Sequence, residues 1–191
     1  CPDPDPVLTL EVMPNSPVAP YYHHDDPKTL LKHLYDHLSP DKIEIDTINF
    51  TGPAFKDVDN RLMSLQLVRN GMTNAVMFAP SGNNVLPANV LYKKNILTLR
   101  GSFRPVTNIN ISMYEKSLQM FMDEHKVERA ATEVIFEMTL FNLKAEGDEI
   151  DEKDFLNRAD LLCALGHTVM ISNFQQYYKV VDYFAQFTSE P

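Results

Sequence analysis

Positively charged side chains gather in one short segment of this acidic sequence, which has 17 Lys and Arg residues against 26 Asp and Glu. Four of the cations lie close together: Lys93, Lys94, Arg100 and Arg104. The alternating residues 96–99 run into Arg-Gly-Ser and then a proline, which predicts a strand that ends in a turn. Arginines, the Ser102 hydroxyl and free backbone N–H groups around a turn can hold phosphate or carboxylate. Anion binding by residues 100–107 is therefore the first chemistry that this sequence suggests.

The same residues allow a structural interpretation. Arg100 and Arg104 can pair with some of the 26 carboxylates, and exposed pairs of this kind are common and weak. Gly101 and Pro105 are ordinary turn residues. The sequence leaves the choice between an anion site and a structural turn open.

A second candidate follows the alternating residues that end at Phe50. Asp57 and Asp59 lie beside an amide and an arginine after a Gly-Pro turn. Two carboxylates and an amide could bind Mg²⁺ next to a phosphate. The alternative is that one of the two aspartates caps the helix predicted to begin near Asn60.

Polar residues also follow the apolar segment 169–171, where Ser172 and Asn173 are candidate ligand contacts. A complete catalytic signature is missing from the sequence. It has no Walker or Gly-x-Gly-x-x-Gly loop, and no serine in a Gly-x-Ser-x-Gly elbow. Cys163 falls on the apolar face of a predicted helix. The sequence thus proposes ligand contacts but identifies no cofactor and no reaction.

The elements that must position these residues alternate along the chain. Apolar periodicity predicts strands over 43–50, 75–78, 96–99, 134–140 and 169–171. Helical spacing predicts helices over 28–38, 60–70, 111–125, 155–163 and 175–187. Strands separated by helices favour an α/β protein with a mainly parallel sheet of about five strands and helices on both faces. We expect a Rossmann-like sheet, with part of a β/α barrel as the alternative, and ligand groups at strand ends.

Composition divides the chain into two parts. Residues 1–27 hold seven of the 13 prolines and are interpreted as an extended arm that contacts a protein partner. Residues 28–191 are interpreted as a single α/β domain, which suits a chain of 191 residues with 44% hydrophobic and 23% charged residues.

Charge and cysteine content limit the partners. A net charge of -9 argues against nucleic acid, because the long-range field repels phosphate, although a local basic pocket could still take a phosphate-bearing small molecule. No apolar stretch approaches the roughly 18 residues that span a bilayer. The two cysteines are too few for a disulfide framework. We therefore expect an intracellular, reducing compartment.

Several strings of the sequence together resemble an uncharacterised family of bacterial proteins, many of them from cyanobacteria and proteobacteria. The strings are Tyr21–His24, Phe50–Phe55, Val58–Leu65, Val90–Lys94, Arg100–Thr107 and Ile171–Phe174. Members of that family are longer than this chain, which lacks their flanking segments and could be a fragment, a trimmed form or a reduced descendant. They carry inconsistent labels, either nicotinate-nucleotide adenylyltransferase or TonB-dependent receptor.

The two labels have different implications. A TonB-dependent receptor is an outer-membrane barrel, which the helical periodicity of this sequence contradicts. The adenylyltransferase label suits an α/β chain, but the His-x-Gly-His loop of that enzyme family has no counterpart here. The resemblance therefore transfers no catalytic residue to this sequence.

Two function classes stay open at this point. The first is a non-catalytic α/β module, a subunit of a larger assembly, with an anion-binding turn at 100–107. The second is a Mg²⁺-dependent, nucleotide-handling enzyme of nucleotidyltransferase type, in which the lysines and arginines neutralise phosphate. An open pocket shared by the cationic turn and Asp57–Arg61 would favour the enzyme. Arginines tied to internal carboxylates would favour the module.

Overall fold

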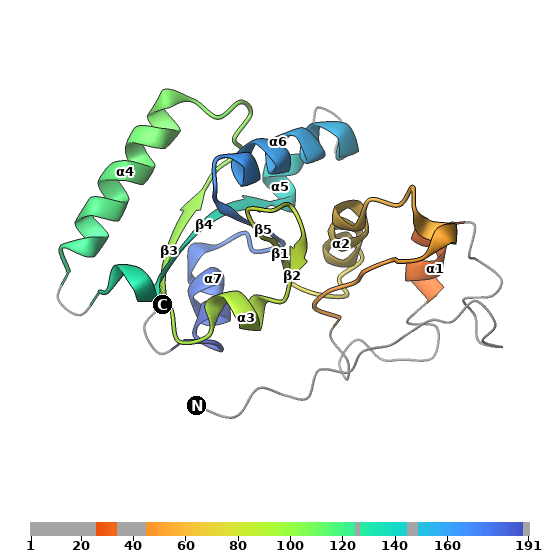
Figure 1. The fold of residues 1–191 in the computed structure, drawn as a ribbon, viewed down its shortest axis with the longest axis horizontal. Coiled ribbons are helices and arrows are strands. Elements are labelled where there is room, and N and C mark those ends of the chain that lie inside the picture. The colour runs from red at the N-terminus through yellow and green to blue at the C-terminus, as the bar shows by residue number, and fades with distance from the viewer. Residues whose placement is uncertain (1–25, 34–44, 125–126, 145–148, 189–191) are drawn as a thin grey trace.

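The computed structural model describes residues 26–33, 45–124, 127–144 and 149–188 of the chain (Figure 1). Within these ranges the strands are β1 (Ala75–Phe78), β2 (Asn84–Val85), β3 (Asn95–Arg100), β4 (Thr132–Thr139) and β5 (Thr168–Ser172). The helices are α1 (Pro27–His33), α2 (Asn60–Arg69), α3 (Pro87–Leu91), α4 (Asn108–Met122), α5 (Leu140–Leu143), α6 (Glu152–Ala164) and α7 (Tyr177–Phe184). The described residues therefore form an α/β fold.

The five strands form one open sheet in the order β2-β1-β5-β4-β3. Strands β3, β4 and β5 are mutually parallel, and each crossover between them carries a helix, α4 and then α6. Strand β1 is antiparallel to both of its neighbours, β2 and β5. The prediction of a mainly parallel sheet was therefore wrong. The short loop after β1 explains the antiparallel β1–β2 pair, because it returns the chain directly as a hairpin and leaves no room for a crossover helix. The antiparallel pairing of β1 with β5 joins strands that are distant in sequence and does not follow from that loop.

Helices cover both faces of the sheet, as the sequence predicted. On one face, alternate β4 side chains such as Val134, Phe136 and Met138 pack in a cluster with residues of α2 and α6. On the other face, Ile135 packs with residues of α3 and α7, including Phe184. Strand β4 is buried over most of its length. This two-sided burial explains why its sequence is a continuous apolar run.

Side-chain caps fix where the main helices begin. Asp59 accepts a hydrogen bond from the backbone N–H of Arg61 and starts α2. Thr107 and Asn110 form a reciprocal capping box at the start of α4. Asp151 caps α6 in a similar way. These caps place the loops that precede α2, α4 and α6 at defined positions around the sheet.

Other sequence expectations differ from the structure. Residues 45–50 belong to no strand, although the alternation up to Phe50 predicted one, and the short strand β2 takes the fifth place in the sheet. Ile45 and Ile48 instead pack on the core from an irregular segment, so alternation here reflects burial without sheet pairing. The proline-rich arm lies outside the described residues except at its end, where Pro27 begins α1.

None of the helices in the described part of the chain is long and apolar enough to span a lipid bilayer.

Candidate functional site

The four clustered cations of the sequence do not share one site. Lys93 and Lys94 precede β3, whereas Arg100 ends it, so the strand separates them by about 20 Å at its usual rise per residue. Lys94 Nζ donates a hydrogen bond to the carbonyl oxygen of Ala130 at 3.1 Å. Lys93 Nζ lies 4.9 Å from the centroid of the neighbouring Tyr92 ring. The two lysines therefore belong to the opposite end of the sheet from the two arginines.

Arg100 forms a buried ion pair with Glu137 across β3 and β4. Its Nε and Nη2 each donate to a carboxylate oxygen at 2.8 Å, and the two side chains are 9% and 0% exposed. Ser172 Oγ donates to the same carboxylate at 2.6 Å. Arg100 Nη1 donates to the carbonyl of Gln175 at 3.2 Å, and the Tyr177 ring centroid lies 4.5 Å from its guanidinium carbon. Acceptors inside the protein thus hold Arg100 on several sides.

The two polar residues after β5 have internal partners as well. Ser172 is completely buried and is occupied by Glu137. Asn173 Nδ2 donates to Asn74 Oδ1 at 3.2 Å. The structure therefore brings Ser172 together with Arg100, as the sequence anticipated, but it joins them through a carboxylate that the sequence analysis did not single out.

Arg104 is the more accessible arginine of the turn. Its Nε lies 3.4 Å from Asp154 Oδ1, and half of the Arg104 side chain is exposed. The same carboxylate accepts two hydrogen bonds from the buried Arg158. Arg158 Nη1 also donates to the carbonyls of Ser102 and Asn142, at 3.0 and 2.9 Å. Ser102 thus contributes its backbone to a structural contact, and its exposed side chain lies beside the turn.

The two aspartates considered as magnesium ligands have different environments. Asp59 caps α2, which was the alternative interpretation, and it also pairs with Arg61. Asp57 lies exposed in the preceding turn. Within the described residues, no group of three or more His, Cys, Asp or Glu side chains is placed to hold a metal ion.

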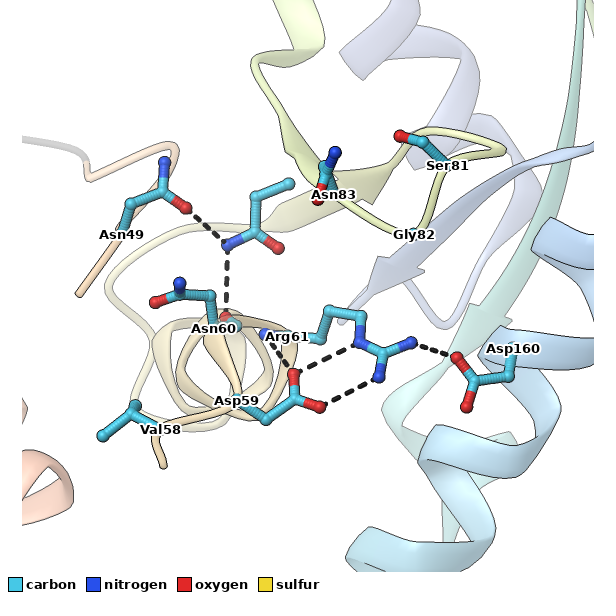
Figure 2. A pocket seen from close by; sticks show the side chains of 10 residues that line it. Asn49, Val58, Asp59, Asn60, Arg61, Ser81, Gly82, Asn83 and Asp160 are labelled. Carbon is cyan, nitrogen blue, oxygen red and sulfur yellow. Dashed lines mark hydrogen bonds and ion pairs between the residues drawn. The ribbon is translucent and has the colours of Figure 1, made fainter. Parts of the chain in front are cut away.

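An open hollow of about 660 Å³ lies beside the loop between β1 and β2 (Figure 2). In the strand order this is the edge of the sheet opposite β3, whose end carries the cationic turn. The loop after β1 forms part of its wall, and the antiparallel pairing of Phe78 with Val169 puts that loop near the start of β5. The α2 N-terminus, Asn49 from the segment before it and Asp160 of α6 supply the rest. Its lining residues are Asn49, Val58, Asp59, Asn60, Arg61, Ser81, Gly82, Asn83, Asn84 and Asp160. The hollow therefore joins Asp59 and Arg61 to a hairpin loop and does not include Arg100 or Arg104.

Arg61 lies at the centre of the charges that line this hollow. Its Nη2 donates to Asp59 Oδ2 at 2.9 Å, and its Nη1 donates to Asp160 (Figure 2). The hydrogen bonds to Asp59 and Asp160 raise the pKa of Arg61 above its ordinary value. Burial by itself raises the pKa of Asp59, but the hydrogen bonds and charge of Arg61 outweigh it and hold that pKa below its ordinary value. Asp59 is therefore a stable carboxylate and a poor general base near neutral pH.

Two other titratable groups near the core are shifted by burial. Burial raises the pKa of the Cys163 thiol, which keeps it protonated and weakly nucleophilic. Burial also lowers the pKa of His167. Its ring lies 4.3 Å from the Phe136 ring and 4.8 Å from the Tyr114 ring, measured between centroids. Both side chains therefore belong to the packing of the core.

Sequence reasoning missed three residues that define these sites: Glu137, Arg158 and Asp160. Two of them carry a signal in the sequence. Glu137 is a polar residue within an otherwise apolar strand, and Arg158 is a cation on a helix that buries the residue next to it. Asp160 carries no such signal, because it is an ordinary exposed residue of α6 until the fold brings it to Arg61.

Comparison with known proteins identified no matching family model, no matching curated protein and no matching solved structure.

Proposed function

We propose that this chain is a non-catalytic α/β module that works as a subunit of a larger assembly. The observation that carries the proposal is that both arginines of the cationic turn pair with carboxylates of the protein itself, Arg100 with Glu137 and Arg104 with Asp154. A phosphate at Arg100 would have to displace a fully buried carboxylate that also accepts a hydrogen bond from Ser172. Such an exchange is unfavourable, because it leaves the charge of Glu137 unpaired.

The cationic turn and Asp57–Arg61 lie at opposite edges of the sheet. This separation further supports the module over the nucleotide-handling enzyme. A phosphate held by the arginines could not be reached by a metal ion held at Asp59. In the proposed module, Arg104 stays paired with Asp154, and Lys93 and Lys94 have no common role with the two arginines. In this proposal, only the three parallel strands β3, β4 and β5 form a Rossmann-like arrangement.

Helix α4 supports the assembly part of the proposal. Ile109, Met113 and Met120 are 71%, 57% and 71% exposed. Their spacing of four and seven residues places them along one stripe of the helix. The opposite side of α4 packs on the core through Tyr114 and Leu118. A helix with apolar residues on its solvent side as well as its core side is typical of a protein contact surface. In this proposal the stripe and the arm of residues 1–27 contact the same assembly.

The ligand side of the proposal is tested by a thermal-shift screen of nucleotides and dinucleotides, each with and without Mg²⁺. We expect no shift in melting temperature. A ligand present at about 100 times its Kd would stabilise the protein by about 2.7 kcal/mol. A reproducible shift that needs Mg²⁺ and disappears in Arg104→Ala would favour the enzyme instead.

The assembly side is tested by affinity purification with three forms of the chain. These are the wild type, an Ile109→Lys/Met120→Lys variant of the α4 stripe, and the control Phe141→Lys, which changes another exposed apolar side chain. We expect a partner that is recovered with the wild type and the control and lost with the stripe variant. Equal recovery by all three forms would contradict a contact through α4.

A further inference from the structure

The hollow beside α2 has the volume of a small-molecule site, but it is open and its lining is mostly polar. Its volume of about 660 Å³ falls within the range of ligand pockets, which is roughly 300–1,000 Å³. Eight of the ten residues that line it have polar side chains, and none is aromatic. An apolar ligand would therefore leave most of this lining without hydrogen-bond partners.

The charges that line the hollow nearly cancel. Arg61 lies between Asp59 and Asp160, so one positive charge faces two negative charges. The excess carboxylate disfavours phosphates and other anions, and the guanidinium between the carboxylates disfavours a metal ion or an organic cation. The net formal charge of -1 disfavours an anion, and the pairing of both carboxylates with Arg61 weakens their attraction for a cation, so a neutral ligand fits better than either.

Several polar groups of the lining are not used by the fold. The Ser81 hydroxyl and the Asn83 amide project from the hairpin loop and make no hydrogen bond to the described residues (Figure 2). Arg61 uses three of its five N–H groups on the two carboxylates. The hollow therefore offers both donors and acceptors, which is the pattern that complements hydroxyl groups.

Asn84 adds a buried acceptor without a donor. Its Nδ2 donates to the Ile48 carbonyl at 2.9 Å and to Ser64 Oγ at 2.8 Å, and these acceptors fix the orientation of the amide. The Oδ1 atom on its other side is buried and accepts no hydrogen bond from the residues that the structure describes. Buried polar atoms of native proteins nearly always have partners. Because this oxygen has almost no accessible surface, it is not among the groups that the hollow offers to a ligand.

We infer that this hollow binds a small, neutral, polyhydroxylated molecule, such as a sugar or a cyclic polyol. Ser81 and Asn83 are the contacts on the hairpin loop, Arg61 donates from the helix side, and Asp160 accepts from the α6 side. Gly82, with φ 81°, allows the tight turn that places the two loop side chains. The inference does not depend on the partner contact proposed for α4, and either can fail without the other.

Ligand-detected NMR with a defined set of probes tests this inference. The neutral probes are glucose, galactose, trehalose and myo-inositol, and the charged probes are pyrophosphate and spermidine. We expect saturable binding of at least one neutral probe at millimolar concentration, and no saturable binding of the charged probes. Binding of none of the neutral probes, or tighter binding of a charged probe, would overturn the inference.

Variants of the hairpin loop locate the binding. Ser81→Ala/Asn83→Ala removes two exposed side chains that make no hydrogen bond to the described residues, so we expect an unchanged melting temperature and binding weakened by about tenfold or more. The control is Ser102→Ala, which removes an exposed serine at the other edge of the sheet and should leave the affinity unchanged. Equal affinity of the loop variant and the wild type would place the probe elsewhere and overturn the assignment of this hollow.

Discussion

Two arginines, Arg100 and Arg61, are each held by carboxylates, but at opposite edges of the sheet and at different depths. Arg100 pairs with one fully buried glutamate, and a serine hydroxyl completes the cluster. Arg61 pairs with two aspartates, of which Asp160 is 60% exposed, beside an open hollow. The same arginine–carboxylate pairing is therefore buried at one edge of the sheet and borders an open hollow at the other.

The difference shows why a cluster of cations in a sequence does not identify an anion site. At Arg100 the balancing charge comes from the neighbouring strand, in register across the sheet. At Arg61 it comes from the same helix cap and from a residue 99 positions later. Only the depth of each pair, which depends on the whole fold, determines whether its polar groups remain available to a ligand.

Arg100→Ala is expected to have the largest effect on stability. The substitution leaves the buried Glu137 carboxylate without its counter-ion, and we expect the free energy of unfolding to fall by about 3–5 kcal/mol. Urea denaturation measures it. The double variant Arg100→Leu/Glu137→Leu should recover most of the loss, because it removes both charges. A loss below about 1 kcal/mol for Arg100→Ala would mean that this pair resembles a surface pair.

Arg158→Ala is expected to have the second-largest effect on stability. The side chain is 4% exposed and satisfies Asp154 and the carbonyls of Ser102 and Asn142, so its removal should cost about 2–3 kcal/mol. The control Lys153→Ala lies on the same helix but is exposed, and should change stability by no more than about 0.5 kcal/mol. Equal effects of the two substitutions would show that the 100–107 turn is not anchored through Arg158.

Arg61→Ala tests whether the partly solvated Arg61 pairs contribute less to stability than the buried Arg100 pair. Its partners are partly solvated, so we expect a loss of about 1 kcal/mol or less in the same urea experiment. A loss as large as that of Arg100→Ala would contradict the distinction between a buried pair and a pair at the rim of a hollow.

The pH dependence of Asp59 is a smaller effect with a defined sign. Because the pKa of Asp59 is held below its unfolded value of about 3.9, its contribution to stability is present above that pH. The contribution is lost as the pH falls through the lowered pKa. Asp59→Asn keeps a helix-capping side chain, so this variant should lose less stability than the wild type on acidification below about pH 4. If the free energy of unfolding fell equally in both proteins as the pH was lowered, the pairing of Asp59 with Arg61 would be contradicted.

The sequence predicted the α/β class, helices on both faces and four of the five strands. Apolar runs such as Val134–Leu140 and Val169–Ile171 carry this information locally, because buried strands require them. The direction of β1 and the strand β2 could not be predicted in the same way. Strand β2 depends on a hairpin loop whose polar residues fit an ordinary loop equally well, and the direction of β1 depends on its long-range pairing with β5.

For the candidate sites, the sequence identified both partners of the Asp59–Arg61 pair, but it missed Glu137 beside Arg100 and Asp160 beside Arg61. Arg100, Ser172, Asp59 and Arg61 were found from local charge and turn signals, and capping by Asp59 was anticipated as the alternative to a metal site. Glu137 and Asp160 are distant in sequence, and their roles arise from strand register and from the approach of α6 to α2. A single sequence can mark Glu137 as a polar residue in an apolar strand, but it does not show which residue pairs with it, and it does not mark Asp160 at all.

The central claim is that the protein's own carboxylates occupy the arginines of the cationic turn. Isothermal titration of pyrophosphate into the wild type and into Arg104→Ala, at low ionic strength, tests it most directly, because Arg104 is the more exposed arginine of the turn. We predict no saturable binding at millimolar concentration and the same result for both proteins. Saturable binding to the wild type that Arg104→Ala abolishes would contradict the claim and restore the turn as an anion site.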